Sequence, residues 1–406
     1  MSLLDRLAKP FQRRSTSTAV LHRIDEFVNL FSNDSSFSGV SVTRKNAMQV
    51  ATVYACVRVL SEGVAALPVR VVRMEGTTRV PELDHPVAVL LNKRPNEWQT
   101  GLEFRETLMI HAALEGNGYA FKVRGARDQV VELIPLMPEQ VSVQQMPGHE
   151  LRYDVSDHKG EIIGRYGQKD ILHLRGPSRD GYEGMNTIKV AQQAIGLSIA
   201  TERSQAKLHS NGGRPGGLLS TDQKLQPDQL VKLREAWDSA FKGSNQFKTA
   251  VLDAGFKFMP LAMSGVDSQH LETRRFEIEE VCRFFNVSPQ MIMHTDKTST
   301  YASAEAFFAA HVRHTLQPWL RRCEQVFDKH LLDGVGPLET VHDTRELVKP
   351  SAADREKFYR TMAEIGVYTR NELRELEGLA PLPGLDEPLT PMNMTPGGTN
   401  NENPAP

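Results

Sequence analysis

Residues 287–308 read VSPQMIMHTDKTSTYASAEAFF and separate two stretches of helical patterning. Pro289 ends the first helix, because proline has no backbone N–H and cannot continue one. The apolar residues Met291, Ile292 and Met293 follow, and a polar run then leads into the second helix. Loops longer than a simple connection are often functional. We therefore interpret this one as a working loop with an apolar base; the alternative is an ordinary surface loop.

The helices on both sides of this loop have recognisable patterns. The preceding helix places apolar residues on one face: Leu271, Ile278, Val281, Cys282 and Phe285. The following helix is predicted from about Ala302 to Leu332, roughly 45 Å at 1.5 Å per residue. Pro318 lies near its middle. A proline there removes one hydrogen bond and pushes against the carbonyl of His314, so the sequence predicts a kink at Pro318.

The rest of the chain alternates between helical and extended patterns. A helix is predicted before Pro68, and a strand follows in VRVVRM. Six short apolar-alternating segments within residues 119–176, separated by Gly, Pro or Asp turns, predict an antiparallel sheet region. A further helix after Gly184 carries a single apolar stripe: Ile188, Ala191, Ile195 and Ile199. The sequence therefore predicts a mixed α+β protein.

Composition limits the function. The 406 residues carry a formal net charge of −2, so the chain lacks the basic excess typical of proteins that grip duplex DNA tightly. No stretch approaches the roughly 20 apolar residues needed to cross a bilayer. Cys56, Cys282 and Cys323 are far apart in the sequence and lie in apolar helical patterns. They are interpreted as buried thiols rather than disulfides or zinc ligands.

Motifs for chemistry are weak. NGGRPGG at residues 211–217 lacks the Gly-Lys-Ser/Thr helix start of a phosphate-binding loop, and is interpreted as a hinge. His311 and His314 can share a helical face, but no further metal ligand stands at a persuasive spacing. Four aromatic residues are assigned to the core rather than to a base-stacking surface: Trp237, Phe307, Phe308 and Trp319.

The order of five stretches resembles the HK97-type family of tailed-bacteriophage portal proteins. The stretches are ATVYACVRVLSEGVAALPVRV, HPVAVLLNKRPNEWQTGLEFRETLMIHAALEGNGYAF, HSNGGRPGGLLS, FEIEEVCRFFNVSPQMI and GVYTRNELRELEGLAPLPG. Together they cover most of residues 46–385. None is diagnostic alone, but five in the right order make chance agreement improbable. The resemblance implies the portal-protein fold, assembled as a ring of about twelve subunits.

The family architecture implies a division of this chain. The segments are an N-terminal arm (1–45), the first part of an α/β wing (46–183), stem helix 1 (184–211), a clip (212–265), stem helix 2 (266–287), a tunnel loop (288–302), a wing part with the long kinked helix (303–345), a helical crown (346–380) and a disordered tail (381–406).

Two groups of functional residues follow. The tunnel-loop tip is expected to face DNA in the channel and consists of His294, Thr295, Asp296, Lys297, Thr298, Ser299, Thr300 and Tyr301. The charged face of stem helix 2 is expected to form ion pairs with a neighbouring subunit, through Glu272, Arg274, Arg275 and Glu279. One lysine beside one aspartate gives the tip a nearly neutral charge, which suits DNA that slides.

The resemblance also implies a setting. The ring would sit at one vertex of the virion capsid, after assembly in the host bacterial cytoplasm, and double-stranded DNA would be packaged and ejected through it. Its partners would be the terminase large subunit, a head–tail adaptor, and the major capsid and scaffold proteins. Neither a membrane nor a cofactor, metal or catalytic residue is expected. Two alternatives stay open: a cytosolic enzyme with a dispersed active site, and another ring-shaped head–tail connector.

Overall fold

The three-dimensional structure is a computed structural model. It describes residues 36–76, 78–82, 84–126, 128–210, 217–220, 226–232, 235, 257–260, 266–294, 307–332, 336–344, 347 and 352–389. The chain divides into two compact units, Met1–Asp343 and Thr344–Pro406.

Four helices precede or flank the first strands of unit 1: α3 (Arg44–Ala47), α4 (Ala51–Ala65), α5 (Pro86–Asn92) and α6 (Gly101–Glu115). Helix α6 begins with a capping box, in which the Thr100 hydroxyl accepts from the backbone of Glu103 and the Glu103 side chain accepts from the backbone of Thr100. It ends at Gly116, whose φ of 74° is a left-handed conformation that favours glycine. Helices α4 and α6 pack together.

A three-stranded sheet joins distant parts of unit 1. Its order is β11 (Leu338–His342), β1 (Val69–Glu75), β2 (Thr78–Pro81), and both pairings are antiparallel. Val69 lies opposite His342. Two acidic side chains fix β11 to the long helix: buried Glu324 accepts from the backbone N–H of His342 at 2.8 Å, and half-buried Asp328 accepts from that of Thr340 at 2.6 Å.

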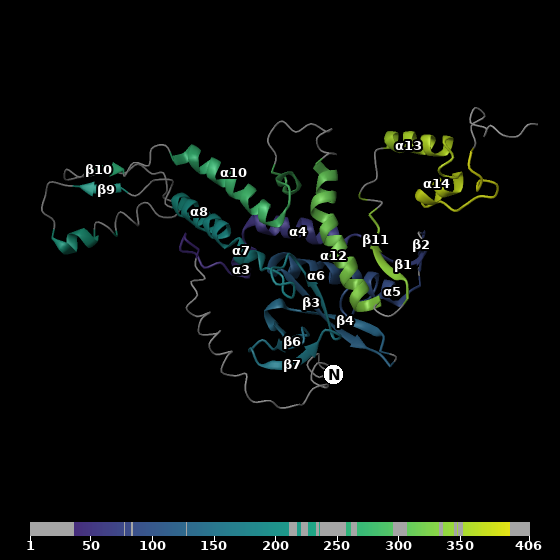
Figure 1. Ribbon diagram of the computed structural model, residues 1–406. Coiled ribbons are helices and arrows are strands. Elements are labelled where there is room, and N and C mark those ends of the chain that lie inside the picture. Colours follow the sequence, from purple (N-terminus) through teal and green to yellow (C-terminus); the bar gives the residue numbers. More distant parts are fainter. Residues whose placement is uncertain are drawn as a thin grey trace, which may run out of the picture. The chain divides into compact units, whose positions relative to one another are not determined.

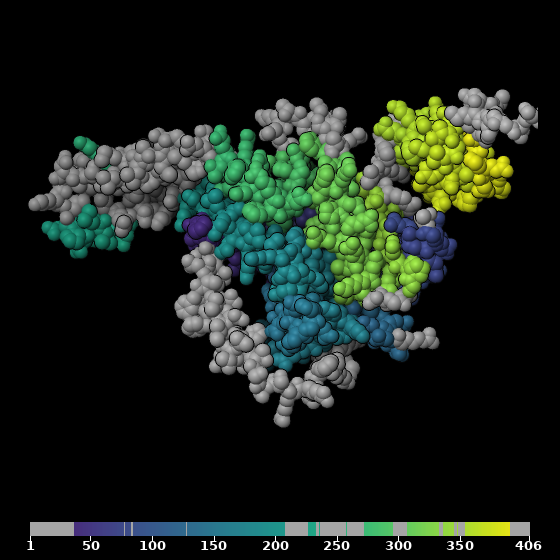
Figure 2. Space-filling view, in the orientation of Figure 1, coloured from purple at the N-terminus to yellow at the C-terminus, as the bar shows by residue number. Residues whose placement is uncertain are grey.

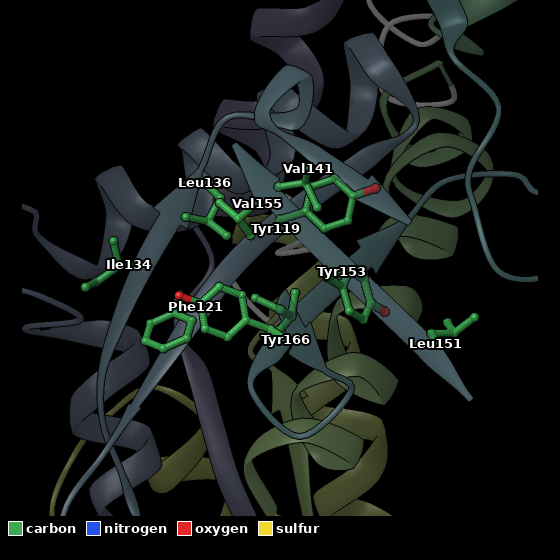
Figure 3. Close-up of a cluster of buried hydrophobic side chains, with 10 residues drawn as sticks. Tyr119, Phe121, Ile134, Leu136, Val141, Leu151, Tyr153, Val155 and Tyr166 are labelled. Atoms are coloured by element: carbon green, nitrogen blue, oxygen red, sulfur yellow. The ribbon is translucent and has the colours of Figure 1, made fainter. Parts of the chain in front are cut away.

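The six predicted strands within residues 119–176 are present, and every pairing is antiparallel as expected. One sheet has the order β4 (Val130–Leu136), β3 (Asn117–Arg124), β8 (Ile171–Arg175). The other has the order β5 (Val141–Gln145), β6 (Leu151–Ser156), β7 (Ile162–Gly167), and η1 (Pro138–Gln140) links the two. Both sheets contribute to one aromatic-rich core, shown in Figure 3, in which Tyr119 packs edge to face on Tyr153.

The next region consists of helices and a small hairpin: α7 (Thr187–Val190), α8 (Gln192–Ser210), β9 (Gly217–Ser220), β10 (Lys257–Pro260) and α10 (Val266–Phe285). Strands β9 and β10 pair antiparallel. The predicted stripe of Ile188, Ala191, Ile195 and Ile199 is buried throughout. Figure 1 shows α8 and α10 side by side, and α10 also packs on α4.

The long helix after the loop is described from residue 307. It contains a π-helical segment η4 (Val312–Leu316), then α12 (Gln317–Phe327), then a second π-helical segment η5 (Asp328–Leu332). The assignment of Phe307 and Phe308 to the core is wrong, because 38% and 41% of their surfaces are exposed. They lie one turn before His311 and Val312, at the first described residues of the long helix, and Phe307 lines a cavity together with His311. Trp319 is half-buried, and Trp237 lies outside the described residues.

Unit 2 contains α13 (Ala352–Glu364) and α14 (Arg370–Leu376). Arg355 forms a 2.8 Å ion pair with Glu377, and the Tyr359 hydroxyl donates to the same carboxylate at 2.6 Å. The Asn371 side chain accepts from the backbone of Leu382 at 2.9 Å and donates to Asp386 at 2.7 Å. The first residues of the predicted tail are therefore tied to α14, while residues 390–406 lie outside the described part. The described helices include none that is long and apolar enough to span a membrane.

Candidate functional site at the junction of α10 and the long helix

Helix α10 ends in a Schellman motif centred on Asn286. The backbone N–H of Asn286 donates to Arg283 at 3.2 Å, and that of Val287 donates to Cys282 at 3.0 Å. Asn286 has a φ of 53°, a left-handed conformation that asparagine tolerates better than most residues. These bonds satisfy carbonyls that a helix end otherwise leaves unpaired, and they turn the chain sharply toward η3 (Pro289–Ile292).

Asn286 also binds the long helix. Its side-chain N–H donates to the His314 carbonyl at 3.0 Å, and its own carbonyl accepts from the Thr315 hydroxyl at 2.6 Å. His314 is four residues before Pro318, so its carbonyl would lack a donor in a regular α-helix. Asn286 supplies that donor, and η4 places a widened π turn directly before the proline. The predicted kink at Pro318 stays a prediction; the proline lies where the helix changes its hydrogen bonding.

A cavity of about 430 Å³ lies at this junction. The end of α10, η3 and the start of the long helix line it, with Glu279, Cys282, Arg283, Asn286, Val287, Ser288, Pro289, Phe307, Ala310, His311, His314 and Thr315. His311 is 4% exposed, and burial lowers its pKa, which favours the neutral ring. His314 is exposed. The two histidines thus meet different environments, and the described residues hold no cluster of three or more metal-ligating side chains.

The base of the predicted loop is η3 and the two residues after it. Met291 and Ile292 are partly buried, and η3 packs on α4 and α10. Met293 differs: it has a φ of 63° and is 92% exposed, so the described residues leave its side chain uncovered. His294 closes the turn by donating its N–H to Pro289 at 3.0 Å. The other predicted tip residues lie outside the described residues: Thr295, Asp296, Lys297, Thr298, Ser299, Thr300 and Tyr301.

The outward face of α10 carries the other predicted group. Glu272, Arg274 and Arg275 are exposed, and Glu279 is half-buried. Arg274 donates to Gln205 of α8 at 2.9 Å, and Glu279 pairs with Arg283 at 3.4 Å. Both contacts lie within one chain, so the role of these residues between subunits stays a prediction. Figure 2 shows α10, in green, at the molecular surface beside the teal of α8.

Two aromatic residues on that face were not singled out from the sequence. Phe276 is 54% exposed and Phe284 is 39% exposed, and the Arg283 guanidinium lies over the Phe276 ring at 5.4 Å. Both lie off the buried stripe of Val281, Cys282 and Phe285, and an aromatic residue off the apolar stripe of an amphipathic helix is the signal that could have identified them. On the inner side, Val281, Cys282 and Phe285 are buried as predicted, and buried Glu277 accepts from Thr201 of α8 at 2.9 Å.

Comparison with known proteins identifies the family. A family model described as phage portal protein matches residues 51–378. The chain belongs to the phage portal protein family. The family is a structural one, and the function as a phage portal follows from this membership.

Relatives and a solved structure agree with that assignment. The chain is 29% identical over 371 residues to the portal protein of Enterobacteria phage HK97, covering 89% of this chain and 87% of the relative. It is 30% identical over 381 residues to the probable portal protein of Streptomyces phage phiC31, covering 88% of this chain and 81% of that relative. A chain in the neck of a native gene transfer agent particle, solved with C12 symmetry, has a similar fold, with a TM-score of 0.56 and 23% sequence identity. The match covers 84% of this chain and 95% of that one. The predicted α+β portal-protein fold class is confirmed.

The fold also brings together two cysteines that lie far apart in the sequence. All three cysteines are buried and free, as predicted. However, the sulfur of Cys56 on α4 lies 3.8 Å from the sulfur of Cys282 on α10. No local pattern could indicate this contact, because 226 residues separate the two positions.

Proposed function

We propose that the chain acts as one subunit of a ring of about twelve, through which double-stranded DNA enters and leaves the virion. The solved relative with C12 symmetry supports a ring of this order. Head-to-tail rings need two different surfaces on each subunit, and closure depends on how they meet. The observation that carries the proposal is the outward face of α10. This face exposes charged and aromatic side chains, although the chain has a separate core that is buried.

We assign the segments as the sequence implies. The wing is residues 46–183 with 303–345, and the stem is 184–211 with 266–287. The clip is residues 212–265, the tunnel loop is residues 288–302, and the crown is residues 346–380. The pairing of β1 with β11 supports treating the two wing parts as one module. The packing of α8 on α10 supports a two-helix stem.

The stem face would contact the next subunit through Glu272, Arg274, Arg275 and Glu279. Reversing charge in R274E/R275E should prevent ring formation, because like charges would then meet across the contact. The monomer should stay folded, since both side chains are exposed. The matched control is K159E/K169E, which reverses two exposed lysines in the turns on either side of β7. Normal rings from R274E/R275E, measured by native mass spectrometry, would reject this contact.

The loop tip, residues 294–301, would meet DNA in the channel without holding it. One lysine and one aspartate leave little net charge, and each additional phosphate contact would add affinity and salt sensitivity. The variant D296K/T298K/S299K should form rings but package or retain DNA differently, with a strong salt dependence. The control T395K/T399K/E402K changes net charge equally in the tail. If the loop variant packages DNA as the wild type does at every salt concentration, the loop does not touch DNA.

The clip would bind the terminase large subunit and later the head–tail adaptor, and the wing would meet the major capsid and scaffold proteins. Assembly in the host cytoplasm, a final place at the virion vertex and the absence of catalytic activity belong to the same proposal. Exchanging residues 212–265 for the segment of a distant relative should abolish terminase binding while the wing still folds. Terminase binding that survives the exchange would place the docking surface elsewhere.

A further inference from the structure

Cys56 and Cys282 join two helices that lie far apart in the sequence. Cys56 is in the middle of α4, and Cys282 is near the end of α10, just before the turn at Asn286. Their sulfurs are 3.8 Å apart, and the two residues are 0% and 1% exposed. A disulfide has about 2.05 Å between its sulfurs, so the two sulfurs must move closer together, which modest side-chain and backbone shifts allow. Cys323, on α12, is buried but has no such contact with another cysteine in the described chain.

The cavity at the junction reaches one of the two sulfur-bearing residues. Cys282 belongs to its lining, beside Arg283 and His311, while Cys56 does not. A small uncharged oxidant that enters the cavity would therefore meet Cys282 first. Cys56 lies behind it, shielded from the cavity but within reach of the Cys282 sulfur.

The hydrogen bond between the thiols gives them different roles. Cys56 donates its S–H to the sulfur of Cys282. That bond lowers the pKa of Cys282, while it and burial together raise the pKa of Cys56. Because the thiolate is the reactive form, Cys282 is the better nucleophile of the two. Cys56 keeps its proton until a second step needs it.

We propose that Cys56 and Cys282 are a redox pair, which hydrogen peroxide converts to a disulfide between α4 and α10. The Cys282 sulfur attacks one peroxide oxygen, the O–O bond breaks, and a sulfenic acid and one water form. The Cys56 sulfur then attacks the sulfenic sulfur, the S–S bond forms, and the S–O bond breaks to release a second water. Two thiols and one peroxide thus give one disulfide and two waters. An external dithiol reverses the change.

The bond would fix the end of α10 against α4. That end carries the Asn286 contacts to the long helix and leads directly into η3. Oxidation would therefore restrict movement between the helix pair α8–α10 and the core helices α4 and α6. A cross-link that closes so long a segment also limits the unfolded chain, so the oxidised protein should unfold at a higher temperature.

The test uses the full-length protein with hydrogen peroxide as the probe, followed by alkylation and peptide mapping. We expect a Cys56–Cys282 linked peptide as the main product, removed by dithiothreitol, and a Tm raised by roughly 5 °C. The C323S variant is the matched control and should behave as the wild type does. Unchanged thiols at 56 and 282, or links that involve Cys323 instead, would overturn the proposal.

A second variant separates the two roles. In C56S, Cys282 should still react with peroxide but should stop at the sulfenic acid, which dimedone traps. In C282S, Cys56 should give little dimedone adduct, because it lies behind the cavity wall. Equal trapping at both positions, or trapping only in C282S, would contradict the assigned order. Circular dichroism of the untreated variants checks that each one is folded before these comparisons are made.

Discussion

Helices α6 and α10 show how differently two parts of one chain bury their surfaces. Helix α6 buries nine of its fifteen residues inside its own chain, between α4 and β3. Between residues 272 and 285, α10 buries four: Glu277, Val281, Cys282 and Phe285. The same stretch leaves Phe276 and Phe284 exposed. The core around α6 is thus complete within one chain, whereas α10 has an outward face that the described chain does not cover.

The largest effect should come from a core substitution in α6. Phe104 is fully buried, so F104A should lower the free energy of unfolding by about 3–5 kcal/mol through lost burial and the cavity left behind. F276A on α10 should cost the isolated chain under about 1 kcal/mol, because that side chain is already half exposed. Urea unfolding of both variants under conditions that keep the chain monomeric measures the difference. Equal losses would break the comparison between the two helices.

A second pair of variants tests the contact between Gly116, at the end of α6, and Met185, just before α7. Gly116 has a φ of 74°, and a Cβ there would lie 2.1 Å from the Met185 carbonyl oxygen. Gly181 has a φ of 84° with nothing within 4 Å of such a Cβ. G181A should therefore cost about 1 kcal/mol from backbone strain alone, and G116A at least twice that. If G116A and G181A lower the Tm equally in thermal unfolding, the close approach of Met185 at Gly116 does not contribute to stability.

A smaller effect concerns the pH dependence of the core. Burial lowers the pKa of His111 on α6 to about 4, below its usual 6.5. As the pH falls from 6.5 towards 4, His111 is protonated in the unfolded chain but stays neutral in the folded chain. The free energy of unfolding therefore falls. At pH 5 the loss should be about 2 kcal/mol from this residue. The H111L variant should show a correspondingly shallower decline between pH 7 and 5; an unchanged decline would mean that His111 does not titrate this way.

The sequence predicted local structure well where one pattern sufficed. The alternating strands of residues 119–176 and the buried stripe from Ile188 to Ile199 both follow from the period of the side chains. Contacts between distant segments were not predictable in this way. The pairing of Val69 with His342 and the meeting of Cys56 with Cys282 depend on how the whole chain closes. The exposure of Phe307 and Phe308 was missed because a hydrophobic residue in a helix is usually assigned to the core of its own chain.

The mass of the native assembly tests the central claim most directly. If the outward face of α10 is covered by a second copy in a closed ring, the purified chain of 45.4 kDa should assemble into particles of about twelve subunits, near 545 kDa. The double variant F276A/R275E should shift the population to monomers that still unfold cooperatively. A stable monomer or dimer of the wild-type chain at the same concentration would contradict the account.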